Sequence, residues 1–272
     1  MGRSFLARLT GSIVAAGLLG LITACPAAAQ TAGTQTDITT LVGFSNLTNG
    51  YHDQIFASAL GNTLFSNGVG MHSEITYVNR EETGALFTGG LSYNTDHFSI
   101  RGMLGTSTDV QSILPDFYGR LSAEFKGSPA DGFIINPAYM VRTFREGLTD
   151  QSAELRLVKY LPAGPDASVI LEAIGRAGFL DPGPSWIPSG MAGITYASYK
   201  NYSFGVAIDA GRAEYDALVG IGSVNEPYYA IRPSASMYVN KNTELFARAD
   251  YTHRESYQAS GGLVGLKIYL DE

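Results

Sequence analysis

Polar and apolar residues alternate along most of the chain with a period of two. In the run TELFARADYTHRES, residues 243–256, charged Glu244, Arg248 and Asp250 share one series, and Leu245 and Ala247 belong to the other. A period of two places successive side chains on opposite faces of a β-strand. The pattern therefore predicts a strand with one charged face and one apolar face, and leaves open which face meets water.

The same alternation recurs in segments of about ten to thirteen residues, separated by clusters of Asn, Asp, Gly and Pro that close hairpins. No segment keeps a helical stripe beyond a turn or two. We predict an all-β domain with about fourteen strands, or twelve if the first hairpin is misread. The expected strands are 36–47, 52–64, 69–79, 84–94, 97–106, 116–126, 132–144, 150–161, 167–178, 190–199, 202–213, 227–239, 243–254 and 257–270.

The lengths of the connections add information on topology. Three stretches read as long connections, STDVQSILP, LDPGPSWIPS and EYDALVGIGSVNE, and they follow the fifth, ninth and eleventh expected strands. Connections after the even strands are short. Long loops at one end and tight turns at the other are typical of an antiparallel transmembrane β-barrel with an even strand number. We therefore predict a closed barrel of this type.

The two faces of the strands fit a barrel in lipid better than a soluble sandwich. The apolar series consist of modest residues such as Ala, Val, Leu and Gly, and the charges lie in the middle of strands. A spanning sheet must close on itself because lipid cannot satisfy backbone groups. On this interpretation Pro233, which lacks an N–H, is expected at a bulge or near a rim. The charged residues expected to line the lumen are Arg120, Glu124, Arg142, Glu154, Arg156, Glu172, Arg176, Asp209, Arg232, Glu244, Arg248, Asp250 and Arg254.

These inward charges nearly balance, whereas the whole chain has a formal net charge of −7, so the surplus acid belongs to loops and turns. Most of the arginines are expected to pair with carboxylates and brace the barrel wall. The alternative is that some of them contact an anionic or sugar-like solute, for which the planar guanidinium is suited.

Tyrosines gather near the ends of the expected strands. Tyr93, Tyr160, Tyr199, Tyr238 and Tyr269 lie near the last residues of even strands. This placement predicts an aromatic girdle at one membrane interface. The simpler alternative is that tyrosine is common in strands, which explains its presence without its clustering.

The first residues have the composition of an export signal. Arg3 and Arg8 precede the apolar run IVAAGLLGLITA, and AAAQ supplies small residues for cleavage after Ala29. We expect a signal peptide at 1–29 and the barrel at 30–272. The alternative is a lipoprotein signal in LITAC, with Cys25 as the acylated residue. Because Cys25 is the only cysteine, no disulfide is expected in the mature chain.

Candidate chemistry is sparse. A charged fraction of 16% and a net charge of −7 argue against a nucleic-acid partner, which usually needs a clustered basic face. His72 and Glu74 share an expected inward face, but a third metal ligand is not evident. His253 is expected to face lipid or a rim. No catalytic elbow, metalloprotease helix or phosphate loop occurs. We predict no enzyme activity, metal or cofactor, with a rim-located lipid-modifying enzyme as the less favoured alternative.

Two stretches carry a family resemblance. SMYVNKNTELFARADYTHRESYQASGGLVGLKIYL, at the C-terminal end, and TDVQSILPDFYGRLSAEFK, in the middle, resemble YaiO-like outer-membrane β-barrel proteins. The resemblance extends over about 36–270. It implies a signal peptide, a single barrel, residence in the bacterial outer membrane and a link to exopolysaccharide export. It provides no catalytic residues to carry over.

The functional expectation is an outer-membrane barrel that acts as a narrow channel or as an accessory of envelope polysaccharide export. The expected partners are outer-membrane lipid, a polysaccharide or small solute, and other envelope proteins. The alternative is a structural barrel that binds a partner through its three long loops, which include Trp186.

Overall fold

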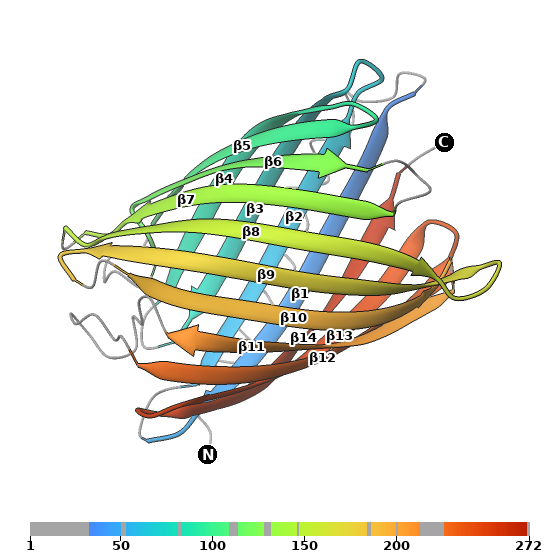
Figure 1. Ribbon diagram of the computed structural model, residues 1–272. Coiled ribbons are helices and arrows are strands. Elements are labelled where there is room, and N and C mark those ends of the chain that lie inside the picture. The colour runs from blue at the N-terminus through green and yellow to red at the C-terminus, as the bar shows by residue number, and fades with distance from the viewer. Residues whose placement is uncertain are drawn as a thin grey trace, which may run out of the picture.

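The chain forms a closed antiparallel barrel (Figure 1). The computed structural model describes residues 33–49, 53–80, 83–108, 114–127, 132–145, 147–183, 186–199, 201–212 and 226–270. Each strand pairs with its neighbours in the chain, and β1 pairs with β14 to close the barrel. Within these residues the strands are β1 (Gln35–Leu47), β2 (Gln54–Leu64), β3 (Val69–Asn79), β4 (Thr83–Asn94), β5 (Phe98–Ser107), β6 (Phe117–Lys126), β7 (Phe133–Thr143), β8 (Thr149–Pro162), β9 (Ala167–Asp181), β10 (Ile187–Ser198), β11 (Tyr202–Arg212), β12 (Pro227–Asn240), β13 (Thr243–Arg254) and β14 (Gln258–Tyr269).

The predicted fold and strand order are confirmed, with fourteen strands among the described residues rather than twelve. The predicted strand ends agree with the observed ones to within three residues. One expected long connection is wrong, because β9 continues to Asp181 and β10 begins at Ile187. Thr149 of β8 pairs with Asp181, which extends the ladder into the expected loop. The other two long connections include 109–113 and 213–225, which lie outside the described residues.

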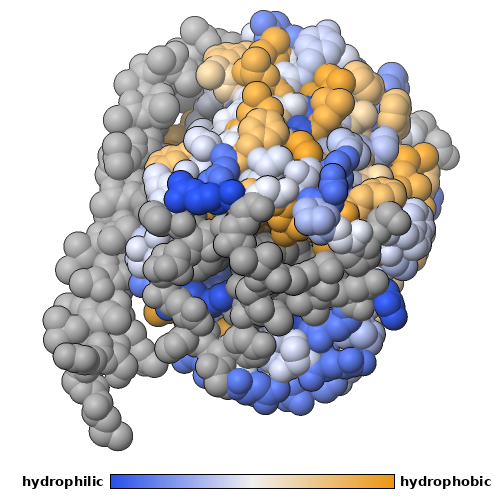
Figure 2. Space-filling model, turned by 90° about the vertical axis from the view of Figure 1, so that its left-hand side faces the viewer, coloured by the Kyte–Doolittle hydropathy of each residue, from blue (hydrophilic) through white to orange (hydrophobic). Residues whose placement is uncertain are grey.

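The outer surface of the wall is apolar. Leu104 is 64% exposed, Leu91 61% and Val264 58%, although each lies inside a strand. Figure 2 shows such apolar residues as orange patches on the outside of the barrel, beside hydrophilic residues in blue. None of the described residues forms a helix long and apolar enough to span a membrane. Exposed apolar residues around a sheet without edges are the arrangement that lipid requires.

The closing seam between β14 and β1 depends on close backbone approach. A Cβ atom at Gly261 would lie 2.1 Å from the carbonyl oxygen of Phe44. At Gly265 it would lie 2.2 Å from Cζ of Phe246 and 2.7 Å from the carbonyl oxygen of Thr40. Only glycine fits at such distances, so the glycine-rich last strand allows β14 to lie against β1.

The position of Pro233 differs from the expectation of a bulge or rim. It lies in the middle of β12 and pairs with Val206 of β11. The irregularity in the pairing of β12 with β13 lies between Tyr238 and Asn240 instead. On the β13 side, pairing runs to Ile231 and resumes at Ser234 without a change of register. The missing N–H is therefore accommodated by a local gap in one ladder rather than by a shift of the strand.

The tyrosines at the strand ends divide between the two faces. Tyr93 and Tyr202 are exposed on the outer series, and Tyr202 stacks on Phe204 with ring centroids 6.3 Å apart. Tyr238 and Tyr269 belong to the inner series, where their rings stack at 6.3 Å. The prediction of a lipid-facing girdle is wrong for these two, because it considered their place along the strand and not their place in the period of two.

Candidate functional site

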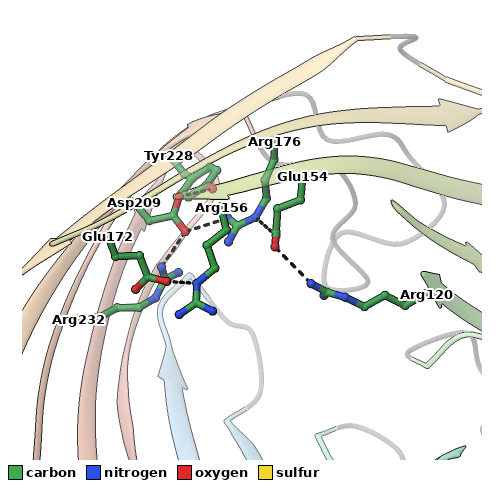
Figure 3. A network of polar contacts seen from close by, with 8 residues as sticks. All are labelled: Arg120, Glu154, Arg156, Glu172, Arg176, Asp209, Tyr228 and Arg232. Atoms are coloured by element: carbon green, nitrogen blue, oxygen red, sulfur yellow. Dashed lines mark hydrogen bonds and ion pairs between the residues drawn. The ribbon is translucent and has the colours of Figure 1, made fainter. Parts of the chain in front are cut away.

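The predicted charged residues meet across the inner face of the wall. Glu154 of β8 and Arg176 of β9 are direct cross-strand partners, and Arg176 Nε lies 2.9 Å from Glu154 Oε2. Arg120 Nη2 of β6 lies 3.2 Å from Glu154 Oε1 and so reaches across β7 to β8 (Figure 3). One carboxylate therefore accepts from two guanidinium groups on different strands.

Asp209 of β11 is the second shared carboxylate of this wall. Its Oδ2 lies 2.7 Å from Arg232 Nη1 and 3.5 Å from Arg176 Nη1, and Tyr228 donates its hydroxyl to Oδ1 at 2.9 Å (Figure 3). The Asp209 side chain is only 4% exposed. Its charge is thus enclosed by the two arginines and the tyrosine that neutralise and satisfy it.

The ion pairs continue onto β13 and form one connected ladder. Arg232 Nε lies 3.2 Å from Asp250 Oδ1, and Arg248 Nε lies 3.0 Å from Asp250 Oδ2. Arginine and carboxylate thus alternate along the inner wall from β6 to β13. In order, the ladder consists of Arg120, Glu154, Arg176, Asp209, Arg232, Asp250 and Arg248.

The other predicted lumen residues lie outside the ladder. Arg156 pairs with Glu172, and Arg142 pairs with Asp150. Glu124 is 3.8 Å from Lys126, its neighbour on β6.

Two further predicted residues contact aromatic rings. Glu244 accepts the Tyr269 hydroxyl at 3.2 Å. The Arg254 guanidinium lies 5.3 Å from the ring centre of Tyr257 and 5.7 Å from that of Tyr228, within cation–π distance. The structure thus joins seven of the thirteen predicted residues in one ladder and places the others in separate contacts.

Several partners were missed by the sequence reasoning. Asp150 is fully buried beside Arg142. Asp150, Ser152 and Glu154 are alternate residues on one face of β8. Continuing the charged series from Glu154 through Ser152 would therefore have identified Asp150. Asp37 of β1 lies 3.5 Å from Lys267 of β14 and links the two strands of the closing seam. Tyr228 carries no charge, so a search for charges could not find it.

A cavity of about 270 Å³ opens beside this ladder. Arg142 lies near the end of β7, and Arg212 and Arg254 are the last residues of β11 and β13. The cavity therefore lies toward the long-loop end, defined as the end at which odd strands finish and even strands begin. Its charged lining residues are Arg120, Arg142, Arg176, Arg212, Arg254 and Glu154.

The histidines do not assemble a metal site among the described residues. His72 Nδ1 lies 2.8 Å from Asn62 Oδ1, and His72 Nε2 lies 2.9 Å from Ser92 Oγ. Glu74, the expected neighbour of His72, instead accepts from Ser58 and Thr76. His72 and Glu74 are thus occupied by separate polar contacts.

The remaining histidines lie apart from that pair. His253 stacks on exposed Tyr229 at 5.1 Å, on the outer series as expected. His97 lies in the exposed turn before β5. His52 lies outside the described residues.

Solved structures with a similar fold are outer-membrane proteins. A bacterial polysaccharide outer membrane secretin aligns with a TM-score of 0.55 and 8% identity, covering 87% of this chain and 98% of that chain. Salmonella typhi OmpF in complex with daunomycin aligns with a TM-score of 0.48 and 13% identity, covering 87% and 97%. The KdgM porin in complex with disordered oligogalacturonate aligns with a TM-score of 0.43 and 13% identity, covering 85% and 98%. At these identities the likeness concerns the fold.

A scan against protein-family models gives no match, and a search of curated proteins gives none either. The architecture is a closed antiparallel β-barrel whose fold resembles that of the secretin, and function has to be argued from the wall itself.

Proposed function

We propose that the protein is a narrow channel of the bacterial outer membrane. The observation that carries this proposal is the two-sided wall, with exposed apolar residues such as Leu104 outside and the ladder from Arg120 to Arg248 inside. The charged side chains on the inner face of the closed sheet can be solvated by water in the lumen. The apolar side chains on the outer face can contact lipid. The thirteen predicted charged residues would then line the path of a solute.

The narrower proposal is a role in the export of envelope polysaccharide. Two observations support it: the resemblance of the middle and C-terminal stretches to YaiO-like barrels, and the likeness of fold to a polysaccharide outer membrane secretin. Under this proposal residues 1–29 are the signal peptide, 30–272 form the mature barrel, and other envelope proteins deliver the polymer. Loss of the gene should then lower the amount of secreted polysaccharide without lowering its synthesis.

Single-channel recording in planar lipid bilayers tests the channel. Purified, folded protein should give discrete current steps, and heat-denatured protein from the same preparation should give none. A heat-modifiable shift on a gel reports folding of the barrel in both samples. Folded protein that gives no current steps over a range of voltages would exclude an open channel.

The second candidate is a structural barrel that binds a partner through its long loops. The observation that favours it is the ladder, because alternating arginines and carboxylates brace neighbouring strands whether or not a solute passes. A closed, folded barrel that loses an envelope partner when 213–225 is deleted would support this role. The rim-located lipid-modifying enzyme is less favoured, and alanine at each histidine with unchanged envelope lipids would dismiss it.

A further inference from the structure

The carboxylates and arginines of the inner wall differ in how far they reach from it. In the Arg120–Glu154 pair the arginine side chain is 34% exposed and the glutamate 17%. In the Arg142–Asp150 pair the values are 30% and 0%. In the Arg232–Asp209 pair they are 25% and 4%. In these three pairs the carboxylate is the more buried partner and the guanidinium group the more exposed one, so a solute in the lumen beside them meets positive charge first.

Arginines are more numerous than carboxylates in the lining of the cavity near the long-loop end. Among the described residues, five of those that line it are arginines, and Glu154 is the one carboxylate. Ser152, Ser189 and Tyr228 add hydroxyl groups to the lining. In the described part of the lining, hydrogen-bond donors therefore greatly outnumber acceptors, which is the reverse of a cation site.

An arginine that pairs with one carboxylate still has N–H donors for other acceptors. A guanidinium group has five N–H donors, so an arginine that holds one carboxylate can still donate to a second acceptor. Arg120 uses Nη2 for Glu154 and, among the described residues, has no second carboxylate within ion-pair distance. Glu154 in turn is shared with Arg176, so one negative charge faces two positive ones.

We infer that this cavity is a binding site for an oxyanion, carried by a solute that bears a carboxylate or a phosphate group. Both groups present coplanar or clustered oxygens that match the guanidinium fork. A volume of about 270 Å³ is close to the lower end of small-molecule pockets, roughly 300 Å³. The cavity therefore suits one small anionic solute, or one acidic unit of a longer chain. The inference deepens the proposed channel and rests on it only for the entry of the solute into the lumen.

Block of the single-channel current by three solutes on one scaffold tests the site. Glucuronate provides a carboxylate, glucose 1-phosphate provides a phosphate, and glucose provides neither. The expected result is concentration-dependent block by at least one of the two anions and none by glucose. Block by one anion or by both identifies the preferred oxyanion. Equal block by glucose, or a conducting channel that neither anion blocks, would overturn the inference while leaving the channel intact.

Arg120→Gln is the informative variant because it removes a lining charge without removing a carboxylate from the wall. The concentration for half-block should rise on the order of tenfold, as expected for the loss of a charge-assisted hydrogen bond. Arg120→Lys keeps the charge and should retain part of the block. Arg248→Gln is the matched control, since Arg248 also pairs with an acid of the ladder but does not line the cavity. An equal loss of block in both Gln variants would contradict the site.

Calorimetry separates the failure of the site from the failure of the channel. If the folded protein gives no current, the channel is excluded, and the same three solutes are titrated into the protein in detergent micelles. Heat released with an anion but not with glucose, and reduced in Arg120→Gln, supports the site. No heat with either anion, or equal heat with glucose, overturns it. A heat-modifiable gel shift confirms that each variant is folded.

Discussion

Glu154 and Arg176 face each other directly across the β8–β9 ladder, with Arg176 Nε 2.9 Å from Glu154 Oε2. The second oxygen of Glu154 accepts from Arg120 of β6 at 3.2 Å. The glutamate therefore connects β6, β8 and β9 and neutralises part of the charge of two arginines. Its removal would leave both guanidinium groups close together in a partly buried wall.

Glu154→Gln should destabilise the barrel by about 1–2 kcal/mol, because a neutral amide holds two arginines less well than a carboxylate does. The measurement is the urea midpoint of refolded protein in detergent micelles. Glu124→Gln is the matched control, since Glu124 only approaches Lys126 at 3.8 Å in a partly exposed pair, and surface pairs contribute about 0–1 kcal/mol. Equal midpoints for the two variants would show that the ladder does not stabilise the wall.

Leu104→Arg tests which side of the wall meets lipid. Leu104 is 64% exposed in the middle of β5, and an arginine facing the membrane midplane costs about 2–4 kcal/mol. We expect a lower yield of heat-modifiable barrel in vesicles. Ser99→Arg on the same strand is the control, because Ser99 lies opposite Glu124 on the inner series. Equal loss of folding in both variants would mean that the outer face is not in lipid.

Much of the fold could be predicted because a period of two is visible in the sequence. The sequence of a single strand shows which residues share a face, as Leu245 and Asp250 of β13 illustrate by falling on opposite faces. The positions of the strands and the residues of the charged face can therefore be predicted without knowing which strands are paired. The place of Tyr238 and Tyr269 on the inner series was available from the same period, and the girdle prediction failed for them because it used only position along the strand.

The pairings of the charges could not be predicted in the same way. The pairings depend on the register between neighbouring strands, and the sequence of one strand does not reveal that register. Arg120 reaches Glu154 across an intervening strand, and Asp209 gathers Arg176 and Arg232 from two different strands. The cavity arises from the same relationships, because Arg142, Arg212 and Arg254 come from three separate strands. The excess of arginines in the cavity can be seen only once the ends of these three strands are brought together in the barrel.

The mature N-terminus provides a test of the export signal, which lies outside the described residues. Cleavage after Ala29 predicts an intact mass that begins at Gln30 and carries no acyl groups. Cys25→Ser should then leave both the mass of the mature protein and its membrane yield unchanged, because residue 25 is removed with the signal. A mature chain that begins at an acylated Cys25, and is lost in the serine variant, would instead identify a lipoprotein.

A chain of polar side chains near the strand ends opposite the long loops predicts a stabilising role for His72. Asn62 donates its Nδ2 to Asp37 at 3.0 Å, so its Oδ1 has to accept from His72 Nδ1–H at 2.8 Å. His72 Nε2 then accepts the Ser92 hydroxyl at 2.9 Å. The histidine thus links β2, β3 and β4 through two hydrogen bonds.

His72→Ala should lower the unfolding free energy by about 1–3 kcal/mol, because it removes the donor to Asn62 Oδ1 and the acceptor of the Ser92 hydroxyl in a half-buried site, although Ser92 Oγ keeps the hydrogen bond from Asn94 Nδ2. Urea unfolding in micelles gives the value. His97→Ala is the control: His97 is exposed in a turn, and its backbone carbonyl accepts a hydrogen bond from Lys126 N–H, which the substitution keeps. We expect no change in that variant. A His72→Ala midpoint equal to wild type would mean that water replaces the imidazole at no cost, and that the wall at this end is held by its backbone ladders alone.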